Sequence, residues 1–164
     1  MNKKIISVIG WIVAFQFISF LIGQFTQADI TSWYVSLPKS TLTPPALVFP
    51  IVWTILYTMI AIAGWILWQH RYETIAQSIM GFYIVQMLFN WSWSPIFFHW
   101  HYITLSFYWI VGTLLFTLIT IRLAWRDYRP VSYLLMPYSL WLMFATYLNG
   151  FIVVSSGAMP FVMH

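Results

Sequence analysis

Residues 74–121 run for 48 positions without one Asp, Glu, Lys or Arg. The whole chain has 164 residues, of which 62% are hydrophobic and 6% are charged, whereas a soluble domain carries about 25% charged residues. A chain with so few charges cannot present a water-compatible surface. The composition therefore predicts an integral membrane protein, and the length fits a single transmembrane domain over residues 1–164.

Apolar runs divide the chain into five segments, each long enough for a bilayer core, which takes about 20 helical residues. The charge-free stretch is too long for one crossing and suits two, with a turn marked by Pro95, His99 and His101. The sequence thus predicts an all-α membrane protein, a five-transmembrane-helix bundle. Its helices are expected at about 5–25, 45–68, 75–98, 103–125 and 131–154.

Two of the prolines, Pro50 and Pro137, are expected to disturb the helices that contain them. Proline removes a backbone hydrogen bond from a helix and clashes with the preceding turn. We therefore expect Pro50 to kink the second helix and Pro137 to break the second turn of the fifth helix.

The first run, residues 5–25, could also be the apolar core of a cleaved signal peptide. That core is only about 7–15 residues long, whereas this run has 21, so a retained membrane span is favoured. Six of the seven Lys and Arg residues lie on one side of the expected bundle, and only Lys39 lies on the other. Positive residues favour the cytoplasmic side, which predicts a cytoplasmic N-terminus and a C-terminus outside.

The polar residues exclude several kinds of chemistry. The chain has no Cys, so thiolate catalysis is impossible. Its three carboxylates lie at expected membrane edges, which disfavours hydrolytic and metal-assisted reactions, and no metal site is predicted. His99 and His101 are two residues apart, unlike the paired histidines of a helical metal site, and are interpreted as interfacial polar groups. The net charge of +4 is assigned to contacts with membrane lipids rather than nucleic acid.

The first connection, residues 26–45, is long, because most connections take about 4–6 residues. Long loops often act as lids or binding loops. This one carries Trp33, Tyr34, Pro38, Pro44 and Pro45. We expect it to act as a lid over the helices.

Aromatic side chains recur at helical spacing directly after this loop. Phe49, Trp53 and Tyr57 are four residues apart and share one face of the second helix. A packing or lipid-facing stripe is the commoner explanation for such a pattern. The alternative is that their π-faces form one wall of a ligand-binding site.

Polar side chains share a face of the third helix: Gln86 and Asn90, with Trp93. Amides at bilayer depth are costly unless paired, so this face should point into the bundle. Asn90 either hydrogen-bonds between helices or orients a polar group of a ligand on which Trp93 stacks. The fifth helix has a comparable face, formed by Trp141, Phe144, Ala145, Leu148 and Asn149. Its small Ala145 indicates either close helix packing or room between larger groups.

Three motifs stand in order along the chain. The first comprises Trp33, Tyr34, Leu37, Lys39, Pro44, Pro45, Trp53, Thr54, Leu56 and Tyr57; the second comprises Gln86, Asn90, Trp91, Ser92, Trp93 and residues 95–98; the third comprises Pro137, Trp141, Phe144, Ala145, Thr146, Leu148 and Asn149. In this order and spacing they resemble the translocator protein family, also called tryptophan-rich sensory proteins or peripheral-type benzodiazepine receptors. The likeness covers nearly the whole chain after the first helix and is closest to the bacterial type.

The resemblance implies a five-helix bundle in the bacterial cell membrane, often a homodimer, with a pocket beneath the first loop. It implies porphyrins such as protoporphyrin IX, and isoquinoline carboxamide or benzodiazepine drugs, as ligands, with no cofactor required. The family's ligand-binding positions carry over to Tyr34, Pro44, Trp53, Tyr57, Asn90, Trp93, Trp141, Phe144, Ala145 and Leu148.

The main hypothesis is therefore a membrane receptor that binds porphyrin-like tetrapyrroles, with Lys39 meeting a propionate at the outer surface. One alternative is a light-dependent porphyrin-degrading enzyme, in which the resemblance makes Trp53 and Trp141 the catalytic residues. The other is a transporter of tetrapyrroles or lipids, but the chain shows neither an internal repeat nor a mid-membrane charge.

Two positions depart from the family pattern. The first loop reads Pro38-Lys39-Ser40 where relatives have Lys-Pro, and no Lys or Arg follows Tyr147 as the animal cholesterol motif requires.

Overall fold

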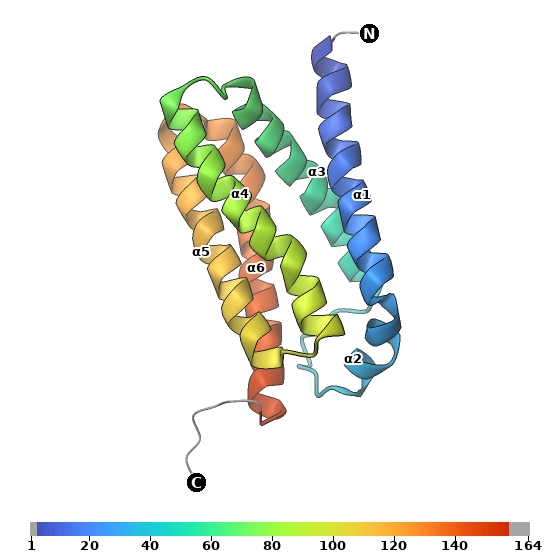
Figure 1. The fold of residues 1–164 in the computed structure, drawn as a ribbon. Helices are drawn as coiled ribbons and strands as arrows, with labels where there is room; N and C mark the ends of the chain where they lie inside the picture. Colours follow the sequence, from blue (N-terminus) through green and yellow to red (C-terminus); the bar gives the residue numbers. More distant parts are fainter. Residues whose placement is uncertain (1–2, 158–164) are drawn as a thin grey trace.

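The computed structural model describes residues 3–157 and is entirely helical in its regular structure over that range (Figure 1). Its elements are α1 (Lys3–Thr31), α2 (Trp33–Ser36), α3 (Val48–Gln69), α4 (Thr74–Ser94), the π-helical segment η1 (Pro95–His99), α5 (Ile103–Asp127) and α6 (Arg129–Ser155). Four of these helices, α1, α3, α5 and α6, are long and apolar enough to cross a membrane. The chain is therefore an all-helical, multi-pass membrane protein, as its composition predicted.

The first helix is longer than expected, because α1 continues from residue 25 to Thr31. Thr26 extends it without cost, since its side chain is buried and its hydroxyl donates to the Ile22 carbonyl at 3.0 Å. The connection that follows contains the short helix α2 and an irregular stretch, residues 37–47. The first loop expected at 26–45 is thus partly helical.

The prolines act differently from expectation. The predicted kink at Pro50 is wrong, because α3 begins at Val48 and Pro50 lies in its first turn, where a missing N–H costs nothing. The predicted break at Pro137 is also wrong, since α6 is continuous through this exposed residue. Pro95 does change the backbone: α4 ends there and η1 begins, with the Trp100 N–H reaching the Pro95 carbonyl at 3.0 Å.

Helix α6 packs against α3 and α5, while α4 packs on α5 and α1 packs on α3 (Figure 1). The buried core includes Ile60, Leu67, Leu135 and Tyr138. Gln86 is fully buried, which confirms that the polar face of α4 points into the bundle. The buried amide of Gln86 has one hydrogen-bond partner from α5, since the Thr117 hydroxyl donates to Gln86 Oε1 at 3.2 Å.

Candidate ligand-binding site

Aromatic rings from α3 and α6 meet along the facing sides of these two helices. The α3–α6 aromatic cluster comprises Phe49, Trp53, Tyr57, Tyr138, Trp141 and Phe144. The Trp53 ring lies 5.3 Å from that of Tyr57 and 6.3 Å from that of Tyr138, while Phe49 meets Trp141 edge-to-face at 5.9 Å. Because these rings contact one another, the aromatic stripe predicted on the second helix packs inside the protein.

Asn90 joins three helices within this cluster. Its Oδ1 accepts a 2.6 Å hydrogen bond from the Tyr57 hydroxyl, and its Nδ2 donates to the Tyr138 hydroxyl at 2.8 Å. All three side chains are buried. Of the two interpretations of Asn90, the structure therefore shows interhelical hydrogen bonding, with both ends of the amide occupied by protein groups.

Trp141 has an unused hydrogen-bond donor. Its indole Nε1 is buried and has no hydrogen-bond partner among the described residues. The ring lies against Phe49 and Phe144, and the ring as a whole is only half-buried. Buried polar groups are normally paired, and an unpaired one calls for an explanation. A ligand acceptor placed beside this indole would supply the missing bond.

The end of α4 carries a second aromatic group, built around Trp93. Its ring stacks on Phe97 of η1 at 5.2 Å with an interplanar angle of 9°, and its indole donates to the Ser106 carbonyl at 3.0 Å. Tyr34 of α2 lies edge-on to Phe97 and Phe98, at 6.0 and 5.2 Å. Burial against these rings raises the pKa of Tyr34 above its ordinary value of 10.0. The short helix α2 is thus docked on the end of the bundle.

Two adjacent polar residues, Lys39 and Ser40, anchor the irregular part of the first loop. Lys39 Nζ donates to the Val35 carbonyl at 2.9 Å and lies 4.8 Å from the Tyr34 ring centre. The next residue, Ser40, is buried and its hydroxyl lies 2.9 Å from that of Tyr147 on α6. The ammonium expected to meet a propionate is therefore used within the loop. Pro44 is half-buried farther along the same stretch.

The remaining predicted residues fall on the faces that the sequence assigned to them. Leu148 is buried, and Ala145 is half-buried beside the core on the same side of α6. Asn149 donates to the Ser106 hydroxyl at 3.2 Å, whereas its Oδ1 is buried and unpaired within the described part of the chain.

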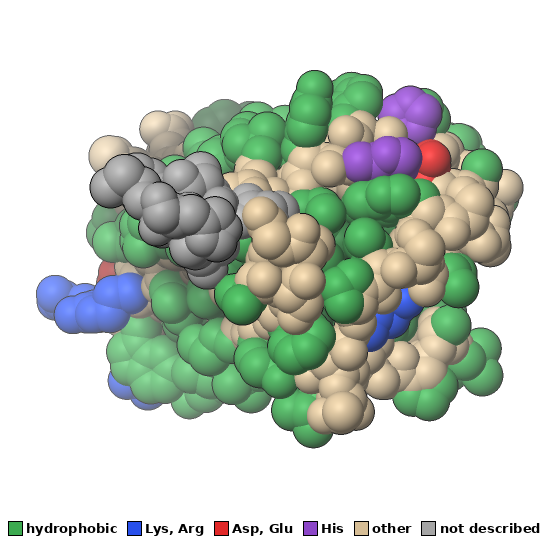
Figure 2. Space-filling view, turned by 90° about the horizontal axis from the view of Figure 1, so that it is seen from below, with side chains coloured by type: hydrophobic (Ala, Val, Ile, Leu, Met, Phe, Trp, Pro, Cys, Tyr) green, Lys and Arg blue, Asp and Glu red, His purple; other side chains and the backbone are tan. Residues whose placement is uncertain are grey.

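Sequence reasoning did not identify one polar cluster at the α2 end of the bundle. Asp29 of α1 approaches two histidines, with 3.1 Å to Nδ1 of His99, the last residue of η1, and 3.5 Å to Nε2 of His101, in the turn after η1. His101 also stacks on Trp33 at 4.0 Å. Figure 2 shows histidine side chains (purple) beside a carboxylate (red) at one edge of this end face. Nothing in the residue spacing signalled this contact, because it joins positions about 70 residues apart. Across residues 3–157, no cluster of His, Cys, Asp and Glu side chains could hold a metal ion.

The fold and this aromatic interior define a small, tryptophan-rich, multi-pass membrane protein. Residues 11–154 match the TspO/MBR family, and the chain belongs to that family. It is 31% identical to the Tryptophan-rich protein TspO of Chlorobaculum tepidum, over 91% of this chain and 95% of that one. It is 32% identical to the Tryptophan-rich sensory protein of Cereibacter sphaeroides over 71% and 72% of the two chains. It is 28% identical to the human Translocator protein over 79% and 78%.

Proposed function

We propose that this protein is a membrane receptor for a flat, hydrophobic, aromatic ligand of the porphyrin class. The site lies between α3, α4 and α6, beneath the first loop. We assign to it three tryptophans from these helices, Trp53, Trp93 and Trp141, each of which is half-buried and packs against the core. Their π-faces suit a conjugated macrocycle, and the same faces suit aromatic drugs of the isoquinoline carboxamide type.

The N–H of Trp141, which has no partner among residues 3–157, carries the proposal. A hydrogen-bond donor buried in apolar surroundings costs free energy until an acceptor reaches it. A propionate, pyrrole nitrogen or amide carbonyl of a bound ligand would remove that cost. This requirement selects a ligand with an aromatic face and an acceptor at its edge.

Binding requires local movement, because the rings of the cluster contact one another. A macrocycle would replace these ring–ring contacts with ring–ligand contacts of the same kind. Access would come from the first loop acting as a lid. That loop is held to α6 by the hydrogen bond between Ser40 and Tyr147, and to η1 by Tyr34. These two attachments are the ones that opening would break.

Fluorescence quenching by protoporphyrin IX in the dark tests this site in detergent-solubilised protein. We expect Trp141→Phe to weaken binding by about 2- to 10-fold, which corresponds to the loss of one hydrogen bond. Trp125→Phe is the matched control, since Trp125 is exposed near the end of α5. Equal affinity in the parent and Trp141→Phe proteins would remove the argument for a ligand at this indole.

The proposal includes α4 as a fifth span. This helix has 21 residues and buries Gln86 and Asn90 away from its surroundings, which leaves an apolar outer surface for lipid. The connections α3–α4 and α5–α6 lie at the same end of the bundle as the N-terminal end of α1, and α2 lies at the opposite end (Figure 1).

We also propose a cytoplasmic N-terminus, an outward-facing C-terminus and assembly as a homodimer. The chain lacks Cys, so single Lys39→Cys and Arg129→Cys variants can be labelled in intact cells with an impermeant thiol reagent. Only Lys39→Cys should react, because the two positions lie on opposite sides in this orientation.

A further inference from the structure

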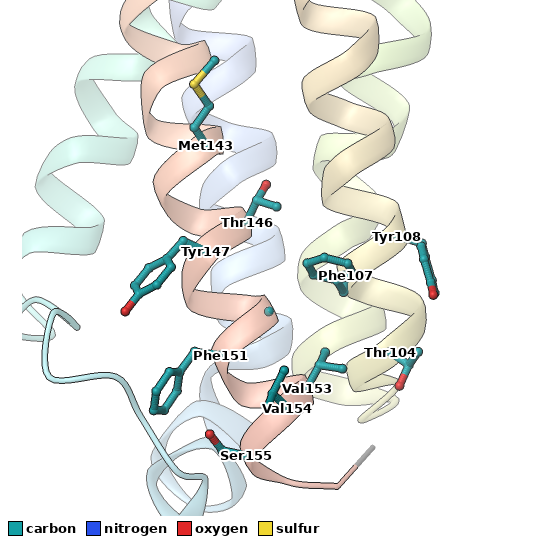
Figure 3. Close-up of a pocket in the computed structure, with 11 residues that line it drawn as sticks. Thr104, Phe107, Tyr108, Met143, Thr146, Tyr147, Phe151, Val153, Val154 and Ser155 are labelled. Carbon is teal, nitrogen blue, oxygen red and sulfur yellow. The ribbon is translucent and has the colours of Figure 1, made fainter. Parts of the chain in front are cut away.

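A groove runs between α5 and α6 on the outside of the bundle, apart from the aromatic cluster. Its volume is about 640 Å³, and its lining includes Thr104, Phe107, Met143, Tyr147 and Ser155 (Figure 3). This volume falls within the range of sites for small organic molecules, about 300–1,000 Å³. The α6 contributors recur at spacings of three and four residues, so they form one continuous face of that helix.

Gly150 sets the depth of the groove. Phe107 of α5 packs directly over this glycine, and a Cβ at position 150 would lie only 3.0 Å from the Phe107 ring. The missing side chain therefore lets the Phe107 ring lie close to the α6 backbone as the floor of the groove. Tyr147 forms a wall whose hydroxyl is held by Ser40 at 2.9 Å.

The groove faces the bilayer. Both α5 and α6 are long and apolar enough to span a membrane, and the groove residues on their outer sides are exposed, with Tyr108 at 61% and Val154 at 62%. In a membrane, exposed surface on a spanning helix contacts lipid hydrocarbon rather than water. The bilayer therefore supplies the occupant directly.

The length of the groove indicates which part of a lipid fits. It begins at the helix ends, where Ser155 is the last residue of α6 and Thr104 is the second of α5. It extends along α6 to Met143, which at 1.5 Å per residue is about 18 Å. One leaflet of the hydrocarbon core is about 15 Å deep, half of about 30 Å. The groove thus matches one leaflet, with hydroxyl groups at the end nearest the bilayer surface.

We infer that this groove holds one acyl chain of a bilayer phospholipid. The chain lies along α6 from Ser155 toward Met143, over the floor formed by Phe107 and Gly150. The headgroup stays at the bilayer surface beside Thr104 and Ser155.

Photolabelling of the full chain in nanodiscs tests this inference. The nanodiscs contain phosphatidylethanolamine and phosphatidylglycerol, with a trace of phosphatidylethanolamine that carries a diazirine within one acyl chain. Illumination should place most of the label on residues 104–108 and 143–155. Val154→Trp adds bulk inside the groove and should lower this labelling at least fivefold. Leu140→Trp is the matched control, because Leu140 is an equally exposed residue of α6, at 65%, outside the groove.

Three results would overturn the inference. The first is label spread evenly over the exposed faces of all helices. The second is equal groove labelling in the parent and Val154→Trp proteins. The third is an unlabelled groove in the parent, which would mean that the protein itself closes or fills it. Circular dichroism of each variant establishes whether it keeps the helical content of the parent.

Discussion

The Tyr57 hydroxyl donates a 2.6 Å hydrogen bond to Asn90 Oδ1, and this bond joins α3 to α4 inside the bundle. Asn90 also joins α4 to α6, because its Nδ2 donates a hydrogen bond to the Tyr138 hydroxyl. Three of the long helices, α3, α4 and α6, are thus tied at one amide in an apolar interior, where direct bonds between polar side chains replace water. The same residues form the back of the proposed ligand site, so the site rests on a fixed polar support.

Asn90→Ala should destabilise the protein by about 1–3 kcal/mol, because it leaves the buried Tyr57 hydroxyl without its partner and removes one of the bonds to the Tyr138 hydroxyl. Tyr57→Phe removes only one of the two bonds and should cost less, about 0.5–1.5 kcal/mol. Chemical unfolding in detergent, followed by circular dichroism, measures both. Porphyrin affinity should fall less in Asn90→Ala than in Trp141→Phe. A variant that unfolds like the parent but no longer binds porphyrin would instead place Asn90 against the ligand.

A second prediction concerns Gly64 of α3, which lies where α1, α3 and α4 pack against one another. An added Cβ would lie 2.7 Å from Tyr83 Cζ and 2.8 Å from Trp11 Cζ3. Tyr83 has little freedom to move, since it is buried and its hydroxyl donates to the Ile60 carbonyl at 2.8 Å. Gly64→Ala should therefore cost about 1–3 kcal/mol through overpacking. Gly81→Ala is the control, because nothing lies within 4 Å of a Cβ there. Thermal unfolding should separate the two variants, and matching losses would contradict the packing argument.

At the end of the bundle away from α2, the stability of the fold should depend on acid through Glu73. Glu73 accepts hydrogen bonds from Tyr128, which joins α5 to α6, and pairs with His70 at 2.8 Å. These bonds, Tyr128 first, lower the pKa of the Glu73 carboxyl below its ordinary value of 4.5. A lowered folded-state pKa means stability that is present above 4.5 and lost as the pH falls through the folded-state value.

Thermal unfolding between pH 7 and pH 3 checks this sign. Burial and the bond to Glu73 raise the pKa of Tyr128 to about 12, so the tyrosine stays protonated across that range. The parent should lose melting temperature below about pH 4.5, and Glu73→Gln should start lower and lose less. Parallel curves for the two proteins would show that another group causes the acid effect.

Helices and membrane character followed from the sequence because both depend on local composition. The spacing of polar and aromatic residues grouped Trp53, Asn90 and Trp141 on helix faces that could line the interior. Asn90 is buried, and the two tryptophans are half-buried against the core. Long-range pairings were not predictable in the same way. The partners of Asn90, the contact of Asp29 with two histidines and the bond between Ser40 and Tyr147 all depend on how helices distant in sequence meet.

Proline effects were misjudged for a related reason. The consequence of a proline depends on its position within a helix, and that position shifts with helix boundaries that a single sequence defines poorly. Pro50 is harmless in the first turn of α3 and would have been disruptive one turn later. The first loop was similarly misjudged, since polar residues after residue 25 are accommodated within α1, where the Thr26 and Thr31 hydroxyls donate to carbonyls of their own helix.

Lys39 provides a test of how the first loop contributes to binding. Its ammonium donates to the Val35 and Leu37 carbonyls and lies near the Tyr34 ring, so it stabilises the path of the loop after α2. On this view, Lys39→Met loosens the lid and weakens every ligand to a similar extent. Protoporphyrin IX and its dimethyl ester, which lacks the propionate charges, should therefore lose affinity by the same factor, within about twofold.

The alternative is that Lys39 leaves the loop to pair with a propionate. In that case only the free acid should lose affinity in Lys39→Met, and at a lipid–water interface the loss of this charge-assisted bond would approach tenfold. Titrations of the parent and Lys39→Met proteins with both compounds decide between a structural lysine and a ligand-binding one.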